Sequence, residues 1–546
     1  MSAARSKRCD KFIPRLRLFL LQNFAPLWRL IDRIPFLARR TNALIINTAC
    51  NAAAFRPHAM STLCDYTSWS SLTDRTYLGR ALPPVETVPA GPTVKETTQL
   101  FIPHGPQREC PKSTLLFPVF AQYLTDGFLR TDSANRDKTT SNHDIDLSPL
   151  YGRTPVQTLC LRLKSPDAGR KGRLKSQMID GEEFPPELYQ LGTSDLAPDF
   201  VDDQGAHLLD LPLGIDKFTT PGEHSRRHLF AVGGDRANST ALVAMLNTLL
   251  LREHNRLAGE LEKLYPGWDD TRVFETARNI VIVLFIKIVI EEYINHISSA
   301  CFPLKADPSV AWPAKWNKPN WMTVEFSLLY RWHALVPETM MWAGQPMNTA
   351  TILLDNSKLI DVGLAQAFQW VGQTNATQLG LHNTAIFLEQ DLTVESLAIL
   401  QNRERRLPGY NAYRQAMGMK PVDDFDCMTG NPAQQQELRA LYGSPDAVDF
   451  YVSLFAEDVG KNTPMPPLLG AMVALDAFSQ ALNNPLLSKQ VYNERTFTPF
   501  GMETIAQTGS LWDILSRNLG AKAPADIGPD QVRMTRRDWK RRFGAF

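Results

Sequence analysis

The stretch Glu325-Phe326-Ser327-Leu328-Leu329-Tyr330-Arg331-Trp332-His333-Ala334-Leu335-Val336-Pro337 holds one imidazole among apolar side chains. Its composition predicts a buried helix that ends at Pro337, because proline cannot continue the backbone hydrogen bonds. On a helix, Tyr330 and His333 would share a face. An imidazole can bind a metal or a haem iron, and a phenol one turn away could exchange an electron with that haem. An aromatic core cluster with one hydrogen-bonded histidine fits the same spacing, so the stretch alone leaves both interpretations open.

Composition describes a large globular protein. Of 546 residues, 44% are hydrophobic and 21% are charged, which is enough for a sizeable core. This length fits several domains, or one large helical domain with an appendage. The formal net charge of +1 gives no electrostatic reason to expect nucleic acid as a partner.

The seven cysteines are odd in number and scattered, and no pair has the CxxC spacing of a metal site. Reduced thiols in a reducing compartment fit this pattern best, which predicts the cytoplasmic side of any membrane. The residues are Cys9, Cys50, Cys64, Cys110, Cys160, Cys301 and Cys427.

The N-terminal part divides into a basic tail, residues 1–11, and a segment of bulky apolar residues and arginines, residues 12–50. We find no secretory signal, and no run approaches the roughly 18 apolar residues that a spanning helix needs. Short helices with an apolar and a basic face are typical of a membrane interface. Ordinary amphipathic helices packed on the protein body would give the same pattern.

The rest of the chain predicts a mainly α fold, without internal repeats or an extended β pattern. In the helix over 117–130, Gln122 and Asp126 lie one turn apart between apolar faces, so these polar groups need partners. The other expected helices are residues 238–261, 271–299, 357–390, 393–402, 434–442, 445–456 and 467–482.

Several motifs resemble known proteins. Gly233-Gly234-Asp235-Arg236-Ala237-Asn238, followed by Arg252-Glu253-His254-Asn255-Arg256, resembles the animal-type haem peroxidase superfamily. Further motifs, in order along the chain, resemble its cyclooxygenase (prostaglandin-endoperoxide synthase) branch. They include Ile34-Pro35-Phe36-Leu37, Arg80-Ala81-Leu82-Pro83-Pro84-Val85, Phe120-Ala121-Gln122, Leu329-Tyr330-Arg331-Trp332-His333 and Ala440-Leu441-Tyr442-Gly443.

This resemblance implies a haem peroxidase-like catalytic domain over residues 51–546 and assigns roles within it. His333 would be the proximal haem ligand, and Tyr330 the residue whose radical removes hydrogen from substrate. Tyr293 would hydrogen-bond that tyrosine, Tyr451 would lie beside the haem, and Gln122 would be the distal glutamine. Residues lining the fatty-acid channel would be Phe326, Leu329 and Trp332. Residues 12–50 would be a monotopic domain bound to one leaflet, and a homodimer is possible.

On the haem side, the sequence departs from the cyclooxygenase pattern. Asp126 occupies the distal histidine position, so peroxide chemistry would need a carboxylate whose pKa burial raises toward the working pH. Arg236 matches the distal arginine of secreted peroxidases and could stabilise charge on a peroxide oxygen, or simply pair with a carboxylate such as Asp126. Positions that esterify haem elsewhere in the superfamily hold Thr125 and Ser239, which implies non-covalent haem b.

Two further departures concern calcium and the substrate. The calcium loop of the secreted peroxidases is only partly echoed by Asp144, Asp146 and Ser148, so we expect no calcium. The carboxylate-clamping arginine of cyclooxygenases falls near Ala49 or Cys50, its tyrosine partner at Ala300, and the serine that aspirin acetylates at Ala477. The substrate is therefore held differently, or its head group is not a carboxylate.

The resemblance thus predicts a haem-dependent dioxygenase that attacks a fatty-acyl or similarly apolar chain with a tyrosyl radical, using O2 and peroxide. One alternative is a peroxidase or peroxygenase that works at the distal face. The other is a non-catalytic haem-binding protein.

Overall fold

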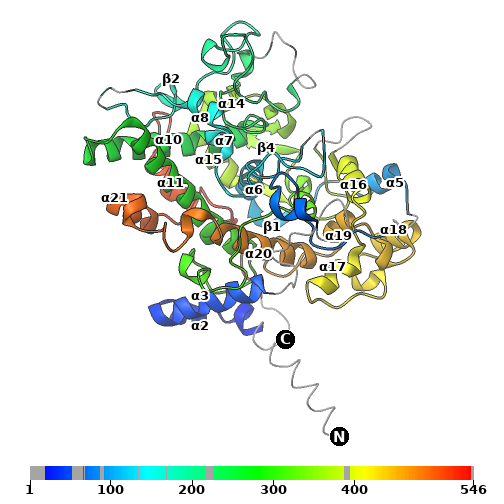
Figure 1. The fold of residues 1–546 in the computed structure, drawn as a ribbon. Coiled ribbons are helices and arrows are strands. Elements are labelled where there is room, and N and C mark those ends of the chain that lie inside the picture. Colours follow the sequence, from blue (N-terminus) through cyan, green and yellow to red (C-terminus); the bar gives the residue numbers. More distant parts are fainter. Residues whose placement is uncertain are drawn as a thin grey trace.

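The computed structural model describes residues 19–51, 66, 68–86, 91–132, 134–165, 167, 169–215, 220, 223, 225–386 and 394–542. The basic tail and the first residues of the 12–50 segment therefore lie outside the described part. Most of the regular structure is helical (Figure 1), which confirms the predicted class.

Two long helices form the centre of the fold. Helices α10 (Ala241–Leu264) and α11 (Asp270–Ile288) are capped by Thr240 and Asp269, respectively. Each capping side chain accepts a hydrogen bond from a backbone amide in the first turn of its helix. The two helices pack against each other. The single helix expected over 271–299 is interrupted, because α11 passes into a π-helical turn, η4 (Val289–Ile294), and then α12 (Asn295–Ile297). Tyr293 on this π-helical turn is fully buried.

Helix α6 (Leu116–Asp126) follows strand β1 (Glu109–Thr114) and packs against α10. Every residue of α6 except Gln122 is buried, as expected for a helix that is apolar on both sides. The strands are short and form three antiparallel pairs. These are β1 with β6 (Asn375–Thr377), β2 (Gln177–Ile179) with β3 (Glu182–Phe184), and β4 (Thr339–Trp342) with β5 (Gln345–Asn348).

The predicted helix over 325–337 is wrong beyond Leu329. Helix α13 spans Val324–Leu329, and a separate 3-10 turn, η6, covers His333–Leu335. In a continuous helix the Leu329 carbonyl would accept the amide of His333. It accepts the indole Nε1–H of Trp332 instead, at 2.6 Å. The backbone leaves helical geometry at Tyr330 (φ −105°, ψ 26°), so Tyr330 and His333 do not share a helix face.

The expected helix over 357–390 is also wrong in its second half. Gly363, at φ 79°, separates α14 (Ser357–Val362) from α15 (Leu364–Gln373), and the chain then enters β6. Positive φ suits glycine, and a Cβ here would meet the Lys522 side chain at 2.8 Å. The segment expected as one helix over 445–456 is the 3-10 turn η9 (Pro445–Ala447) followed by α19 (Phe450–Ala456).

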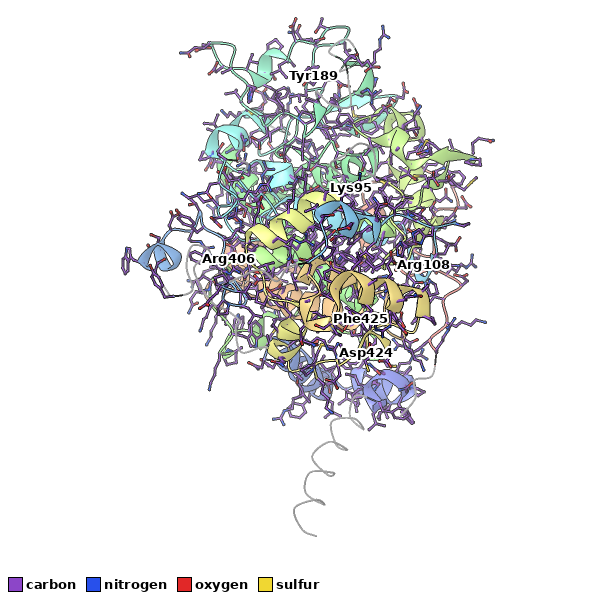
Figure 2. The ribbon with its side chains drawn as sticks, turned by 90° about the vertical axis from the view of Figure 1, so that its right-hand side faces the viewer. Lys95, Arg108, Tyr189, Arg406, Asp424 and Phe425 are labelled. Carbon is purple, nitrogen blue, oxygen red and sulfur yellow. The ribbon has the colours of Figure 1, made fainter. Side chains whose placement is uncertain are left out.

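The remaining predicted helices are confirmed, with shifts of a few residues at their ends. On the face shown in Figure 2, α5, which carries Lys95, packs against α16, and the turn at Phe425 packs against α18. The later helices are α16 (Val394–Glu404), α17 (Tyr410–Ala416), α18 (Pro432–Tyr442), α20 (Pro467–Leu482), α21 (Glu494–Gln507) and α22 (Leu511–Leu515). The earlier short helices are α4 (Trp69–Thr73), α5 (Val94–Gln99), α7 (Ser148–Tyr151) and α8 (Pro155–Leu161). Further 3-10 turns are η1 (Pro198–Phe200), η3 (Ser225–Arg227), η5 (Pro308–Val310), η7 (Thr349–Ile352), η8 (Phe425–Cys427) and η10 (Pro485–Leu487).

Helices α2 (Ala25–Asp32) and α3 (Pro35–Cys50) lie together at one end of the molecule (Figure 1), where α3 packs on α20. One side of this pair carries exposed apolar side chains, among them Leu30 (58% exposed), Phe36 (62%) and Leu44 (67%). Within the described residues, every helix is too short or too polar to cross a bilayer.

Candidate active site

His333 is held by a carboxylate that the sequence analysis did not identify. Its Nδ1 lies 2.9 Å from Oε1 of Glu395, which stands in the first turn of α16 and is almost completely buried. A histidine that donates Nδ1–H to a carboxylate has a fixed ring orientation and a more basic Nε2. An iron bound to this ring would therefore be bound through Nε2.

Tyr451 supports the same carboxylate from the other side. Its hydroxyl donates to Oε2 of Glu395, and burial together with the Glu395 charge holds the pKa of Tyr451 well above its usual value. The phenol therefore stays protonated and remains a donor. Its ring stacks on Phe101 at 5.5 Å between centroids. His333, Glu395 and Tyr451 therefore form one hydrogen-bonded group.

Tyr330 points into a different set of neighbours. Its ring centroid lies 4.8 Å from that of Phe326 and 4.9 Å from that of Trp332. The Tyr293 hydroxyl is buried and lies within hydrogen-bond reach of the Tyr330 phenol. Burial and the nearby Asp476 carboxylate, on α20, raise the pKa of Tyr330, so the phenol is neutral.

The predicted channel residues lie around Tyr330. Besides Phe326 and Trp332, which contact the phenol ring, Leu329 is fully buried at the end of α13. Ala477, at the position of the aspirin-acetylated serine, is buried on α20 beside Asp476. Asp476 therefore places a carboxylate close to both Ala477 and the Tyr330 phenol.

On the distal side, Asp126 is buried, and its Oδ2 atom has no hydrogen-bond partner among the described residues. Burial raises the pKa of Asp126 to about 7, and the positive charge of Arg236 partly opposes this shift. Arg236 donates from Nη1 to the Leu129 carbonyl at 2.6 Å and forms no ion pair with Asp126. The carboxylate therefore meets the condition that a peroxide base requires, a pKa near neutrality.

Arg236 links the two ends of this site, because its charge acts on both Asp126 and Arg331. Gln122, which donates to Ser239 at 2.9 Å, keeps accessible surface although the rest of α6 is buried. Arg236, Arg331 and His333 are also partly accessible beside buried neighbours. An imidazole, an amide, a carboxyl and two guanidinium groups are a donor set that fits an iron porphyrin with acidic side chains.

Other predicted positions have structural partners. The hydroxyls of Thr125 and Ser239 cannot esterify haem, because an ester to a haem methyl needs a carboxylate. Asp146 accepts from Asn142 and from the Ser148 amide, and Asp144 accepts from Asn320. His254, from the second peroxidase-like motif, is buried between the Tyr151 hydroxyl and the Gly172 carbonyl.

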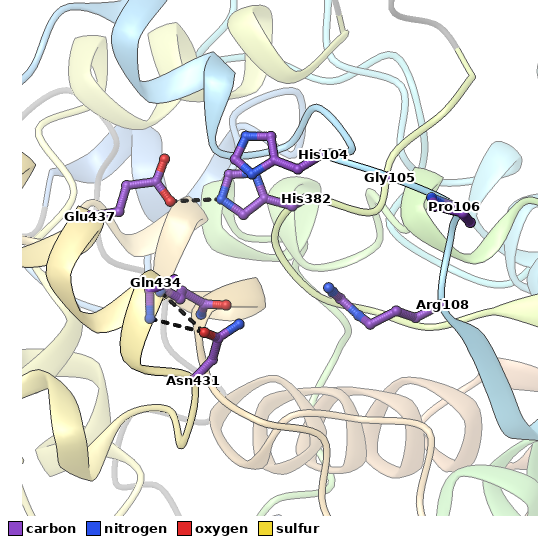
Figure 3. Close-up of a pocket in the computed structure, with 9 residues that line it drawn as sticks. His104, Gly105, Pro106, Arg108, His382, Asn431, Gln434 and Glu437 are labelled. Atoms are coloured by element: carbon purple, nitrogen blue, oxygen red, sulfur yellow. Dashed lines mark hydrogen bonds and ion pairs between the residues drawn. The ribbon is translucent and has the colours of Figure 1, made fainter.

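A separate surface pocket, drawn in Figure 3, contains none of the predicted site residues. In it, His104 stacks on His382 at 4.0 Å, and His382 bonds to Glu437 at 2.7 Å. Arg108, also in this pocket, donates to the Leu381 carbonyl. The pocket is partly open to solvent, and His333 is not among its lining residues.

Comparisons with known proteins agree with this geometry. The family pattern described as animal haem peroxidase matches residues 107–529. The chain is 29% identical over 529 residues to prostaglandin G/H synthase 2 of Bos taurus, covering 94% of this chain and 82% of that protein. It is 30% identical over 523 residues to prostaglandin G/H synthase 1 of Rattus norvegicus, covering 92% and 81%.

Two solved structures share the fold. Peroxidase A from Dictyostelium discoideum superposes with a TM-score of 0.67 at 18% identity, covering 84% of this chain and 95% of that one. Fatty acid alpha-dioxygenase from Oryza sativa gives 0.64 at 17% identity, covering 82% and 81%. The family pattern spans most of the sequence, and the chain therefore belongs to the animal haem peroxidase family.

Proposed function

We propose that this protein is a haem-dependent lipid dioxygenase, in which His333 binds the iron and Tyr330 carries the radical. The proposal depends on one observation: the stretch Glu325–Pro337 is broken after Leu329, so Tyr330 and His333 have different neighbours. His333 faces a carboxylate and a tyrosine suited to an iron ligand, whereas Tyr330 lies among apolar side chains suited to a hydrocarbon chain. The relatedness to prostaglandin G/H synthases and the fold shared with a fatty acid alpha-dioxygenase support this substrate class.

Bound haem would supply one-electron oxidation driven by a peroxide. Tyr330 then loses one electron and its phenolic proton. The resulting phenoxyl takes a hydrogen atom from an activated C–H bond, which restores the phenol and leaves a carbon radical. O2 adds to that carbon, and the peroxyl radical takes the hydrogen atom back from Tyr330 to give a hydroperoxide. Phe326, Leu329 and Trp332 hold the chain and exclude water, which would otherwise solvate the reacting groups.

Optical spectra of the purified protein, followed by oxygen uptake on a panel of unsaturated lipids, test this function. We expect a Soret band that is lost or strongly shifted in the His333→Ala variant, together with lipid-dependent oxygen uptake. The panel should include free fatty acids and neutral esters, because the carboxylate-clamping arginine is missing. A protein without a Soret band would instead support the non-catalytic alternative on a peroxidase scaffold.

Replacement of Glu395 by glutamine should weaken haem binding about 10- to 100-fold, as removal of carboxylates behind metal-bound histidines usually does. The glutamine carbonyl can still accept from His333, but the negative charge that makes Nε2 more basic is gone. Haem titration of the apoprotein measures the effect. Tyr451→Phe, which keeps the carboxylate, is the matched control and should cost less. Unchanged haem affinity in the Glu395→Gln variant would mean that this carboxylate does not act on the iron ligand.

We also propose that α2 and α3 attach the protein to one leaflet, since their exposed apolar side chains stand beside arginines. The double variant Leu30→Ser/Phe36→Ser should bind anionic vesicles at least about 10-fold more weakly, because each lost side chain removes roughly 1.5–3 kcal/mol of apolar burial. Vesicle cosedimentation measures this. Leu191→Ser is the matched control; Leu191 is 71% exposed and close in sequence to Tyr189, which lies at the opposite end of the molecule (Figure 2).

The cellular compartment, the haem type, the absence of calcium and the oligomeric state remain predictions. The odd number and scattered positions of the cysteines predict reduced thiols and the cytoplasmic side of the membrane, which thiol titration of the native and denatured protein tests. Non-covalent haem b should extract into acidified organic solvent, and metal analysis should find iron without calcium. Sedimentation velocity tests the possible homodimer.

A further inference from the structure

Arg331 is a cation deep in the protein without a dedicated counter-ion. Its Nη2 donates to Oε1 of Gln401 at 3.2 Å, and Gln401 is itself held by Ser327. Its Nε atom is buried and has no hydrogen-bond partner among the described residues. A guanidinium stays protonated in proteins, so this positive charge persists even though burial lowers the pKa of Arg331.

Three buried arginines of this chain are neutralised by carboxylates, whereas Arg80, which donates to the Leu82 carbonyl, has no ion pair with a described residue. Arg130 pairs with Asp210 and Asp235, Arg162 with Asp270, and Arg252 with Glu182, all within 3.0 Å. Arg331 makes no such pair with any described carboxylate. Glu395 contributes a favourable charge, but its two oxygens already accept from His333 and Tyr451. A buried, unpaired cation is costly, so an anion is expected beside it when the protein is complete.

Arg236 adds a second positive charge close to Arg331, which gives a further reason to expect an anion there. It approaches Arg331 closely enough for the two positive charges to repel, and within the described part it also has no carboxylate partner. Both residues keep accessible surface, and Arg331 stands two positions before His333, whose neighbours Trp332 and Ala334 are buried. Two guanidinium groups close to each other create a positive potential beside them, which favours a carboxylate ligand.

We propose that Arg331 binds a propionate carboxylate of the haem and so fixes the orientation of the macrocycle over His333. This inference rests on the proposed function, because it assumes that haem occupies the space beside His333. The haem is favoured over the lipid as the source of the carboxylate, because Arg331 is electrostatically coupled to Glu395 and Tyr451 on the iron side. The ring of Tyr330 instead lies among the channel residues.

The test compares protohaem with its dimethyl ester, in which both propionates are neutral. Apoprotein titrations should show that the wild-type chain prefers protohaem about 10-fold or more, as expected for a charge-assisted hydrogen bond. In Arg331→Met this preference should fall close to unity, whereas Arg331→Lys should keep part of it. Arg136→Met, which removes an exposed charge that also reaches Arg331, should leave the preference unchanged.

Equal affinity of the wild-type protein for protohaem and its ester would overturn the inference, whatever the variants do. If haem binds through His333 without such a preference, only this inference fails. If neither porphyrin binds, the proposed function fails with it. Should Arg331→Met instead raise KM for a free fatty acid and not for its methyl ester, with the haem preference intact, the carboxylate belongs to the substrate and the assignment is wrong.

Discussion

The Tyr330→Phe variant is expected to bind haem with an unchanged Soret spectrum and to lose lipid oxygenation to background. The change removes the only group on this side chain that can release a hydrogen atom. It keeps the ring contacts with Phe326 and Trp332 and removes only the interaction with the Tyr293 hydroxyl, so the free energy of unfolding should fall by about 0.5–1.5 kcal/mol. Oxygen uptake and thermal unfolding, measured on the same preparation, separate chemistry from stability.

Tyr293→Phe is the matched control, because it removes a hydroxyl from a neighbouring, fully buried phenol. We expect it to retain oxygenation, with at most a changed rate of radical formation. Spectroscopy of the peroxide-treated enzyme should find a tyrosyl radical in this control and none at position 330 in Tyr330→Phe. Full oxygen uptake by the Tyr330→Phe variant would exclude the proposed mechanism.

Replacing Asp126 by asparagine is expected to lower peroxide turnover about 10²- to 10⁴-fold, the usual contribution of a positioned proton-transfer group. Asparagine has nearly the same shape but cannot take a proton. Because the pKa of Asp126 is raised to about 7, the basic form predominates only above neutrality. Wild-type turnover should therefore rise with pH through about 7, and the variant should lose this dependence. Peroxidase assays between pH 5 and 9 measure both effects, and equal turnover would show that the distal carboxylate is idle.

The same substitution should stabilise the protein at alkaline pH. A carboxyl whose pKa rises from 3.8 in the unfolded chain to about 7 in the folded one favours folding less and less as the pH increases between these values. Above pH 7 the cost is on the order of 4 kcal/mol. Thermal unfolding at pH 8 should thus show a higher midpoint for Asp126→Asn, while at pH 4 the two proteins should differ little.

The periodicity of apolar residues predicted much of this fold. The apolar runs of α6, α10 and α20 identified helices that the structure confirms, because burial on most sides leaves a clear pattern in the sequence. The predicted helices were wrong where a single contact or a single residue conformation ends the helix. Neither the indole of Trp332, which takes the Leu329 carbonyl, nor the positive φ of Gly363 leaves a trace in hydrophobic spacing.

The site was predictable only in part. Resemblance named His333, Tyr330, Asp126 and Arg236, and the raised pKa of Asp126 meets the condition set for it. Glu395 was missed, since it reaches His333 across 62 positions of sequence. Asp476 and Arg331 were given no role, because their importance depends on which side chains share their surroundings.

The break after Leu329 means that Tyr330 and His333 stand on separate backbone segments rather than on one helix. The surroundings of the two side chains can therefore be altered one at a time. A substitution at Glu395, which bonds His333, should leave the aromatic contacts of Tyr330 in place. Under the proposed function, engineering of this scaffold should thus change the redox potential and the substrate range separately.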